Sequence, residues 1–217
     1  MVADNSINAV LTGDLVGSRK VASTSLRRAM DRLEEAARQF GHDWTMDLRF
    51  TRYRGDGWQV LLSQPNLVLH ATLHFHACLR AADIGLDTRI SAGVGTVATV
   101  GTANLNDASG VAFFISGDHL DRAKKRRFLI AGTGIGDWQA GVFHLAEQLA
   151  LGWTAAQAEV VALALSSELT QDEIARRIGV SRQAIQSRLA SSGFSALDEA
   201  LGAFGTYNFK SGGSSHD

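Results

Sequence analysis

The stretch "AVLTGDLVGSRKV", residues 9–21, decides the fold of this chain and raises the first question about its function. Its apolar beginning is typical of a buried strand. The strand then runs through a threonine and a glycine into the carboxylate of Asp14, and small residues and Arg19 follow. A buried strand does not need an acidic end, so Asp14 is a candidate functional residue.

A second stretch, "RFTRYRGDGWQVLL" (residues 49–62), poses the same question. Asp56 lies between Gly55 and Gly57, with strand-like sequence on both sides. Asp-Gly between two strands predicts a tight hairpin, because glycine accepts a positive φ angle. We expect Asp14 and Asp56 to meet in space and to hold a metal ion. The alternative is that one aspartate ends a turn and the other is an ordinary hairpin residue.

Composition limits the class of protein. The chain has 217 residues, 45% of them hydrophobic, which allows one large domain or a medium and a small one. A net charge of −1 excludes a global field that attracts nucleic acid or a membrane surface. The single Cys78 excludes an intramolecular disulfide and a cysteine metal cluster. With no signal-peptide pattern and no apolar run of roughly 20 residues, we expect a cytoplasmic protein without a membrane partner.

The pattern after the first strand predicts an α+β domain over residues 1–150. Ser23 or Thr24 is expected to cap the first helix and Gly41 to end it. Helices packed on a mainly antiparallel sheet follow from the order of the elements. That order is a helix at 24–40, a hairpin at 46–62, a helix at 66–83, a strand at 87–97, a short apolar segment leading into a helix at 111–125, and a strand at 128–132.

The residues around the two aspartates suit a bound metal and nucleotide. Mg²⁺ usually takes one or two carboxylates together with substrate phosphates. The glycines beside Asp56 would let a nucleotide approach the backbone closely. The turn after Asp14 would offer peptide N–H groups to phosphates. Ser18 would add a hydroxyl there and Arg19 a fork of donors.

Three motifs resemble one group of enzymes. "TGDLVGS" resembles the first metal-binding strand of class III nucleotidyl cyclases, "RYRGDGW" their hairpin with the second metal aspartate, and "DTRISAGVGTV" their next core strand. The same palm-type, ferredoxin-like fold is shared with GGDEF domains and polymerase palms. Across nearly its whole length the chain resembles the SatD family, small bacterial proteins with such a domain and a C-terminal helix-turn-helix.

The resemblance implies a site for a nucleoside triphosphate with Mg²⁺ or Mn²⁺. Asp14 and Asp56 would be the catalytic residues and metal ligands, and Leu15 would offer a backbone carbonyl to a second metal. Arg52 stands where many cyclases have the lysine that reads the base, so the base is left open. The nucleotide-binding residues would be Leu15, Gly17, Ser18, Arg19, Arg52, Gly55 and Lys124.

Cyclases also carry an asparagine and an arginine on a late helix, and these have no clear match here. That region reads "GDHLDRAKKRR", residues 117–127, with five basic residues. They would neutralise a triphosphate or a nucleic-acid backbone. The alternative is a solvated helix face.

Two further patterns are interpreted as structural. His70 and His74 share a helix face as zinc ligands do, with His76 close by, but no HExxH motif or obvious third ligand accompanies them. Core or surface histidines are the preferred interpretation. "GTGIGD", residues 132–137, resembles half of a glycine-rich phosphate loop and is interpreted as a turn.

The sequence at 151–205 has helical periodicity and no strand pattern, and predicts a small all-α domain. "LTQDEIARRIGVSRQAIQSRLASSG" carries a capping box of Thr170 and Glu173, a glycine turn, and Ser181 at the start of the next helix. This is the spacing of a DNA-binding helix-turn-helix, and it resembles those of sigma-factor and response-regulator families. Residues 206–217 are expected to be a disordered tail.

By that resemblance, the second helix would bind duplex DNA through Arg182, Gln183, Gln186 and Arg188. The alternative is a helical hairpin used for dimerisation, because residues 151–205 hold four basic and six acidic residues. A single copy would bind DNA weakly, so we expect a homodimer.

Two classes of function remain open from the sequence. One is an enzyme, a metal-dependent nucleotidyl cyclase or nucleotidyltransferase acting on a nucleoside triphosphate. The other is a non-catalytic transcription regulator whose palm domain senses a nucleotide and sets the affinity for DNA. A third reading is that both modules mediate only protein contacts.

Overall fold

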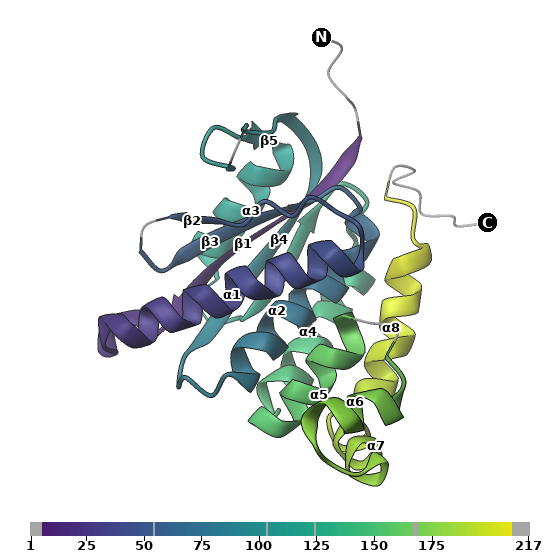
Figure 1. The fold of residues 1–217 in the computed structure, drawn as a ribbon. Coiled ribbons are helices and arrows are strands. Elements are labelled where there is room, and N and C mark those ends of the chain that lie inside the picture. The colour runs from purple at the N-terminus through teal and green to yellow at the C-terminus, as the bar shows by residue number, and fades with distance from the viewer. Residues whose placement is uncertain (1–5, 54, 103, 124, 167–168, 210–217) are drawn as a thin grey trace, which may run out of the picture.

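The computed structural model describes residues 6–53, 55–102, 104–123, 125–166 and 169–209. Its centre is one sheet with helices on both faces (Figure 1). The spatial order is β2-β3-β1-β4, with β6 beside β4 and the short β5 paired with the far end of β4. The strands are β1 (Ile7–Val16), β2 (Thr51–Tyr53), β3 (Gly57–Leu62), β4 (Asp87–Thr99), β5 (Ser109–Gly110) and β6 (Phe128–Gly132).

Helices α1 and α2 cover one face of this sheet and α3 covers the other (Figure 1). The apolar repeat of α1 brings Met30, Leu33 and Phe40 into the core, as its three- and four-residue spacing predicts. Short 3₁₀ helices lie at Ser18–Lys20 and Pro65–Leu67. The α-helices are α1 (Ser23–Asp43), α2 (Val68–Ala81), α3 (Val111–Arg122), α4 (Asp137–Leu151), α5 (Ala155–Ser166), α6 (Gln171–Ile178), α7 (Arg182–Ser191) and α8 (Phe194–Thr206).

The order β1-α1-β2-β3-α2-β4, with its spatial order β2-β3-β1-β4, is the ferredoxin-like arrangement. The pairs β1–β3, β1–β4 and β2–β3 are antiparallel, and β6 adds a parallel pair with β4. The predicted α+β class with a mainly antiparallel sheet is therefore confirmed.

The ends of α1 differ from the expectation. The helix begins at Ser23 without a side-chain cap, so neither Ser23 nor Thr24 caps it. Gly41 does not end the helix, which continues to Asp43. Gly41 lies inside α1 because the chain folds back on it: a Cβ at this position would lie 2.7 Å from the carbonyl oxygen of Met46.

The first strand of the hairpin is shorter than predicted. It was expected from residue 46 and begins only at Thr51. The N–H of Met46 donates to the carbonyl of Gly41 at 2.8 Å, and the N–H of Leu48 donates to the carbonyl of Met46 at 3.1 Å. This backbone bonds to the end of α1 and to itself, so its alternating pattern reflects packing and not sheet pairing.

One hydrophobic core extends across the boundary predicted near residue 150. Trp153, Val161 of α5 and Phe204 of α8 belong to the same cluster of buried residues as Phe75 of α2. The other side of α5 packs with α6 and α7 around a smaller cluster. That cluster consists of Val160, Ile174, Ala175 and Ile185. The division of the chain into two domains stays a prediction.

The residues after α8 extend along the fold as far as the structure describes them. The hydroxyl of Tyr207 donates to the carbonyl of Gly134 at 2.9 Å, and Phe209 is buried. The rest of the predicted tail, residues 210–217, lies outside the described residues. Within the described ranges, no helix has the length and apolar character that a membrane crossing requires.

Candidate functional site

The end of β1 places Asp14 between two neighbouring strands. In the sheet Asp14 is opposite Gly57 of β3 on one side and opposite Arg89 of β4 on the other. The N–H of Leu15 donates to the carbonyl of Asp56 at 3.0 Å, which holds the β2–β3 turn against β1. Strand pairing therefore brings the two aspartates to one end of the sheet.

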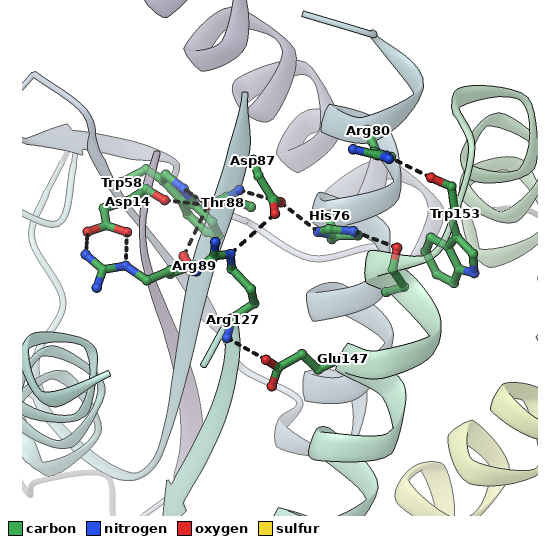
Figure 2. Close-up of polar contacts among 11 residues, drawn as sticks. Asp14, Trp58, His76, Arg80, Asp87, Thr88, Arg89, Arg127, Glu147 and Trp153 are labelled. Carbon is green, nitrogen blue, oxygen red and sulfur yellow. Dashed lines mark hydrogen bonds and ion pairs between the residues drawn. The ribbon is translucent and has the colours of Figure 1, made fainter. Parts of the chain in front are cut away.

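The backbone carbonyl of Asp14 is fixed by two buried side chains, those of Thr88 and Trp58. The hydroxyl of Thr88 donates to the carbonyl of Asp14 at 2.9 Å, and the indole N–H of Trp58 donates to the Thr88 oxygen at 3.2 Å (Figure 2). The indole ring lies over Gly13, where any Cβ would overlap it. The glycine before Asp14 is thus required by the packing of Trp58, whatever the site binds.

Arg89 holds the carboxylate of Asp14 in a two-pronged ion pair. Its Nε donates to Oδ1 at 2.8 Å and its Nη2 donates to Oδ2 (Figure 2). Its remaining Nη1 donates to the carbonyl of Ala123 at 3.3 Å. The bond to Asp14 raises the pKa of Arg89, and the nearby charges of Asp121 and Asp56 act in the same direction. The carboxylate and the guanidinium are 23% and 29% exposed, so both reach the surface.

Asp56 has a different partner. Its Oδ2 accepts a hydrogen bond of 2.5 Å from the hydroxyl of Ser18. Ser18 follows Gly17, whose φ angle of 78° is in the left-handed region that glycine adopts easily. This turn brings the 3₁₀ helix after β1 back beside the hairpin.

These groups line one pocket of about 420 Å³. Two carboxylates and four basic side chains face it, together with the backbone turn after β1. Its lining residues are Asp14, Leu15, Val16, Gly17, Ser18, Arg19, Lys20, Asp56, Arg89 and Arg127. The structure therefore brings together seven of the residues that the sequence singles out, Arg127 of the basic run among them, and adds Val16, Lys20 and Arg89.

Three residues predicted to bind the nucleotide are not placed in this pocket. Arg52 extends from β2 to α1, where it pairs with Asp31 at 2.8 Å and with Glu34. Gly55 is exposed in the hairpin turn, with a φ angle of 81°, and does not line the pocket. Lys124 lies outside the described residues.

Arg127 connects the pocket to the helices behind it. Its Nε donates to Asp87 Oδ2 at 3.4 Å, and its backbone N–H donates to Glu147 of α4 at 2.9 Å (Figure 2). Asp87 Oδ1 lies 3.3 Å from Nδ1 of His76, close enough for an ion pair but not aligned for a hydrogen bond. Nε2 of His76 bonds the carbonyl of Ala150 at 3.2 Å. A chain of polar contacts thus runs from the pocket through β4 to α2 and α4.

The basic run before β6 is not one continuous surface. Arg126 pairs with the buried carboxylate of Glu147 at 2.6 Å, and Arg127 lines the pocket. Arg122 pairs with Asp118 one helical turn earlier, at 2.9 Å. Of the five basic residues that the sequence singles out here, only Arg127 reaches the pocket among those described.

The donor set fits a hard divalent cation. Asp14 and Asp56 offer carboxylate oxygens at the pocket wall, and Mg²⁺ commonly takes one or two carboxylates and completes its shell with phosphate and water. Among the described residues there is no cluster of three or more His, Cys, Asp or Glu that could hold a metal ion without such help. Asp14 and Asp56 are therefore the residues that would hold the ion, alongside phosphate oxygens.

The three histidines of α2 bond to backbone carbonyls. Nε2 of His70 reaches Leu165 at 3.0 Å, and Nε2 of His74 reaches Ala36 at 3.3 Å. Burial lowers the pKa of His74 to about 4, so this ring is neutral near pH 7. His76 belongs to the contacts behind the pocket described above.

Helices α6 and α7 have the local geometry that their sequence predicts. Thr170 and Glu173 form the capping box of α6, and Gly179 ends it with a φ angle of 72°. The side chain of Ser181 accepts the N–H of Ala184 at the start of α7. Arg182, Gln183 and Gln186 are exposed, whereas Arg188 is partly buried and faces Glu159 of α5 at 3.9 Å.

No family model matches this chain, and no curated protein matches it. Eleven chains of solved structures do match, among them a crystal structure of the guanylyl cyclase Cya2. That match has a TM-score of 0.40 and 16% sequence identity, and covers 56% of this chain and 73% of the cyclase chain. The resemblances to the SatD family and to class III cyclases stay predictions, and the function is argued from the geometry of the pocket.

Proposed function

We propose that the pocket at the end of β1 binds a nucleoside triphosphate together with Mg²⁺ or Mn²⁺. The observation that carries this proposal is the lining, which sets two carboxylates among four basic side chains. An anion by itself would be repelled by the two carboxylates, and a cation by itself would be repelled by the four basic side chains. A metal–phosphate complex satisfies both.

Each part of the lining has a role in this proposal. Asp14 and Asp56 hold the cation, and Ser18 keeps the Asp56 carboxylate oriented through its 2.5 Å hydrogen bond. Arg19 and Arg127 offer planar forks of donors, which suit phosphate oxygens. A bound divalent ion would lower the pKa of a hydroxyl or water and neutralise charge on the phosphates.

The same complex serves either of two functions. In an enzyme, a nucleotidyl cyclase or nucleotidyltransferase, the triphosphate is converted with release of pyrophosphate. In a regulator, binding alone is the signal.

Nucleotide binding is tested by isothermal titration of the full chain with each nucleoside triphosphate in the presence of Mg²⁺ or Mn²⁺. We expect at least one triphosphate to bind, and Asp56→Asn to weaken it by about 10-fold or more, the loss of one charge-assisted contact. Asp107→Asn, an exposed aspartate outside the pocket, is the matched control. Equal binding by both variants, or none by the wild type, would contradict the proposal.

Product analysis by mass spectrometry on the same mixtures then separates the two functions. A cyclic or linked nucleotide that is absent with Asp56→Asn identifies an enzyme. Binding without turnover of any nucleotide identifies a sensor.

We further propose that α6 and α7 bind duplex DNA. The capping box, the left-handed glycine between the helices and the exposed polar start of α7 support it. Gln183 and Gln186 are free to reach base edges, and Arg182, 3.4 Å from Asp172, lies beside them. Arg188 contributes less, because it is turned toward Glu159.

Fluorescence anisotropy with a labelled pool of random duplexes, followed by enrichment, tests DNA binding. For the enriched site we expect the double variant Gln183→Ala and Gln186→Ala to weaken binding by about 10-fold or more, since each base contact contributes about 1–3 kcal/mol. Gln148→Ala, on the exposed face of α4, is the control. The dimerisation hairpin would be supported instead by two results together: no sequence is enriched, and the protein is a dimer that the same double variant disrupts.

A further inference from the structure

We propose that Arg89 is an exchangeable counter-ion: it neutralises Asp14 in the free protein, and releases it to the divalent cation and binds phosphate when the metal–nucleotide complex enters. This inference rests on the proposed function of the pocket. It adds a residue that the two aspartate motifs do not include, and it predicts how metal and nucleotide binding depend on each other.

The first observation is that Arg89 occupies both oxygens of Asp14. The fork donates from Nε to one carboxylate oxygen and from Nη2 to the other. A divalent cation can take Asp14 fully only if this fork opens. The Arg89–Asp14 pair is partly exposed, so opening it does not require the core to move.

The second observation is the local balance of charge. In the free protein Arg89 is bonded to Asp14, and the carboxylates of Asp56 and Asp121 also lie near it. The positive charge of the Arg89 guanidinium is therefore balanced by these carboxylates. Once a divalent cation sits on the aspartates, the same guanidinium is repelled by it and is left without its best partner.

The third observation is where the guanidinium would find a new partner. Arg89 and Arg127 line the same pocket, together with Arg19 and Lys20. Arg89 keeps a 3.3 Å bond from Nη1 to the carbonyl of Ala123, which anchors one corner of the group while the other two nitrogens change partner. A guanidinium fork matches two phosphate oxygens as well as it matches a carboxylate.

The exchange has a measurable consequence. The cation alone must displace Arg89 without giving it a new partner, so it binds weakly. The nucleotide supplies that partner, so metal and nucleotide strengthen each other's binding. A coupling of about 5- to 150-fold is the usual range for two linked sites.

The test measures three affinities in the full chain. That of Mn²⁺ alone comes from the electron paramagnetic resonance signal of the free ion, and those of a non-hydrolysable triphosphate analogue with and without Mn²⁺ come from isothermal titration. For Arg89→Gln we expect tighter binding of Mn²⁺ alone, by about 5-fold or more, and weaker binding of the analogue with Mn²⁺ by about 10-fold or more. Arg89→Lys, which keeps the charge but loses the fork, is expected between the wild type and Arg89→Gln in both of these affinities.

Arg127→Gln is the matched control, because Arg127 lines the pocket without touching Asp14. It should weaken the analogue and leave the affinity for Mn²⁺ alone unchanged. Circular dichroism verifies that each variant is folded. If Arg89→Gln is not folded, the comparison is made with Arg89→Lys alone.

Loss of affinity for Mn²⁺ alone in both Arg89 variants would overturn the proposal, since Arg89 would then only hold Asp14 in place. A wild type that binds the analogue with Mn²⁺, without mutual strengthening, would also overturn it while leaving the proposed function intact. A wild type that binds neither Mn²⁺ nor the analogue would instead reject the proposed function itself.

Discussion

Asp87 and Arg89 lie on the same strand, β4, yet they make ion pairs in opposite directions. Arg89 reaches across to Asp14 of β1 at the pocket wall. Asp87 turns toward His76 of α2 and meets Arg127 at 3.4 Å. One end of β4 therefore carries charges that serve the pocket and charges that tie the pocket to the helices.

The balance at Asp87 gives a pH-dependent prediction. Burial alone would raise the pKa of Asp87, but His76, the N–H of Thr88 and Arg127 together lower it below the unfolded value of about 3.9. Its stabilisation is thus present above that value and is lost as the pH falls through the folded-state pKa. Asp87→Asn should lower the free energy of unfolding near pH 7 by about 1–3 kcal/mol, as expected for hydrogen bonds to a charged group.

Urea unfolding measures this effect. The difference between wild type and Asp87→Asn should shrink as the pH falls below the unfolded pKa of about 3.9, and should vanish at the acid pH where the carboxyl is protonated in the folded protein as well. Asp107→Asn, with an exposed side chain, should leave unfolding unchanged at every pH. A difference that stays constant down to that pH would show that Asp87 acts through shape and not charge.

At the scale of elements, the contact between β4 and α3 depends on a glycine. A Cβ at Gly93 would overlap the carbonyl of Ala112 and lie 2.6 Å from the N–H of Ser116. Gly93→Ala must push α3 away from the sheet, and we expect a loss of about 1–3 kcal/mol from overpacking. Gly117→Ala, inside α3 with open space around it, should instead stabilise the protein by about 0.5–1 kcal/mol. Chemical unfolding measures the free energy of unfolding of both variants. If Gly117→Ala were destabilised, the space around Gly117 would not be open as described.

The contact between α4 and the start of β6 depends on one buried carboxylate. Glu147 is 3% exposed and accepts from Arg126 Nε at 2.6 Å and from the N–H of Arg127 at 2.9 Å. Glu147→Ala should cost about 2–4 kcal/mol of stability, because it leaves two donors without their acceptor. It should also loosen Arg127, so the affinity for a triphosphate should fall in the same variant. Glu159→Ala, an exposed glutamate on α5, is the control. A loss of stability with unchanged nucleotide affinity would show that Arg127 does not contribute to binding of the triphosphate.

At the scale of the whole molecule, α5 and α8 complete the core of the sheet domain. Trp153 is buried and its indole N–H donates to the carbonyl of Ser192 at 2.9 Å, and the guanidinium of Arg80 donates to the carbonyl of Trp153 at 2.8 Å. The helices that carry the proposed DNA-binding surface, α6 and α7, pack on α5, and α5 in turn packs on α2. Figure 1 shows them gathered at one side of the sheet domain, away from the β2–β3 hairpin.

This packing predicts that the two parts of the chain do not unfold separately. A fragment of residues 1–152 would expose the face of α2 that α5 and α8 cover, and we expect it to aggregate or to lose its cooperative transition. Thermal unfolding followed by circular dichroism, with the full chain as the reference, measures this. A fragment that unfolds cooperatively at the temperature of the full chain would show instead that residues 1–150 form an independent domain.

The sequence by itself determined the order of the main helices and strands and the α+β class with a mainly antiparallel sheet. It did so because hydrophobic periodicity, Asp-Gly turns and helix caps are local properties, which the chain carries wherever it folds. The same local signals marked Asp14 and Asp56, since an acidic residue at the end of a buried strand conflicts with its surroundings. They also marked the capping box of Thr170 and Glu173, which the structure contains.

Only the tertiary structure decided which side chains surround the two aspartates. Arg89 is far from Asp14 along the chain, and the register of β1 against β4 alone makes them partners. Arg52 and Arg127 are both arginines in strongly basic stretches, yet one is held by the carboxylates of α1 and the other lines the pocket. The packing of α5 and α8 on α2 likewise joins residues that no local pattern connects. A hydrophobic face predicts that it will be buried, but the hydrophobic effect is non-directional and does not specify which element covers it.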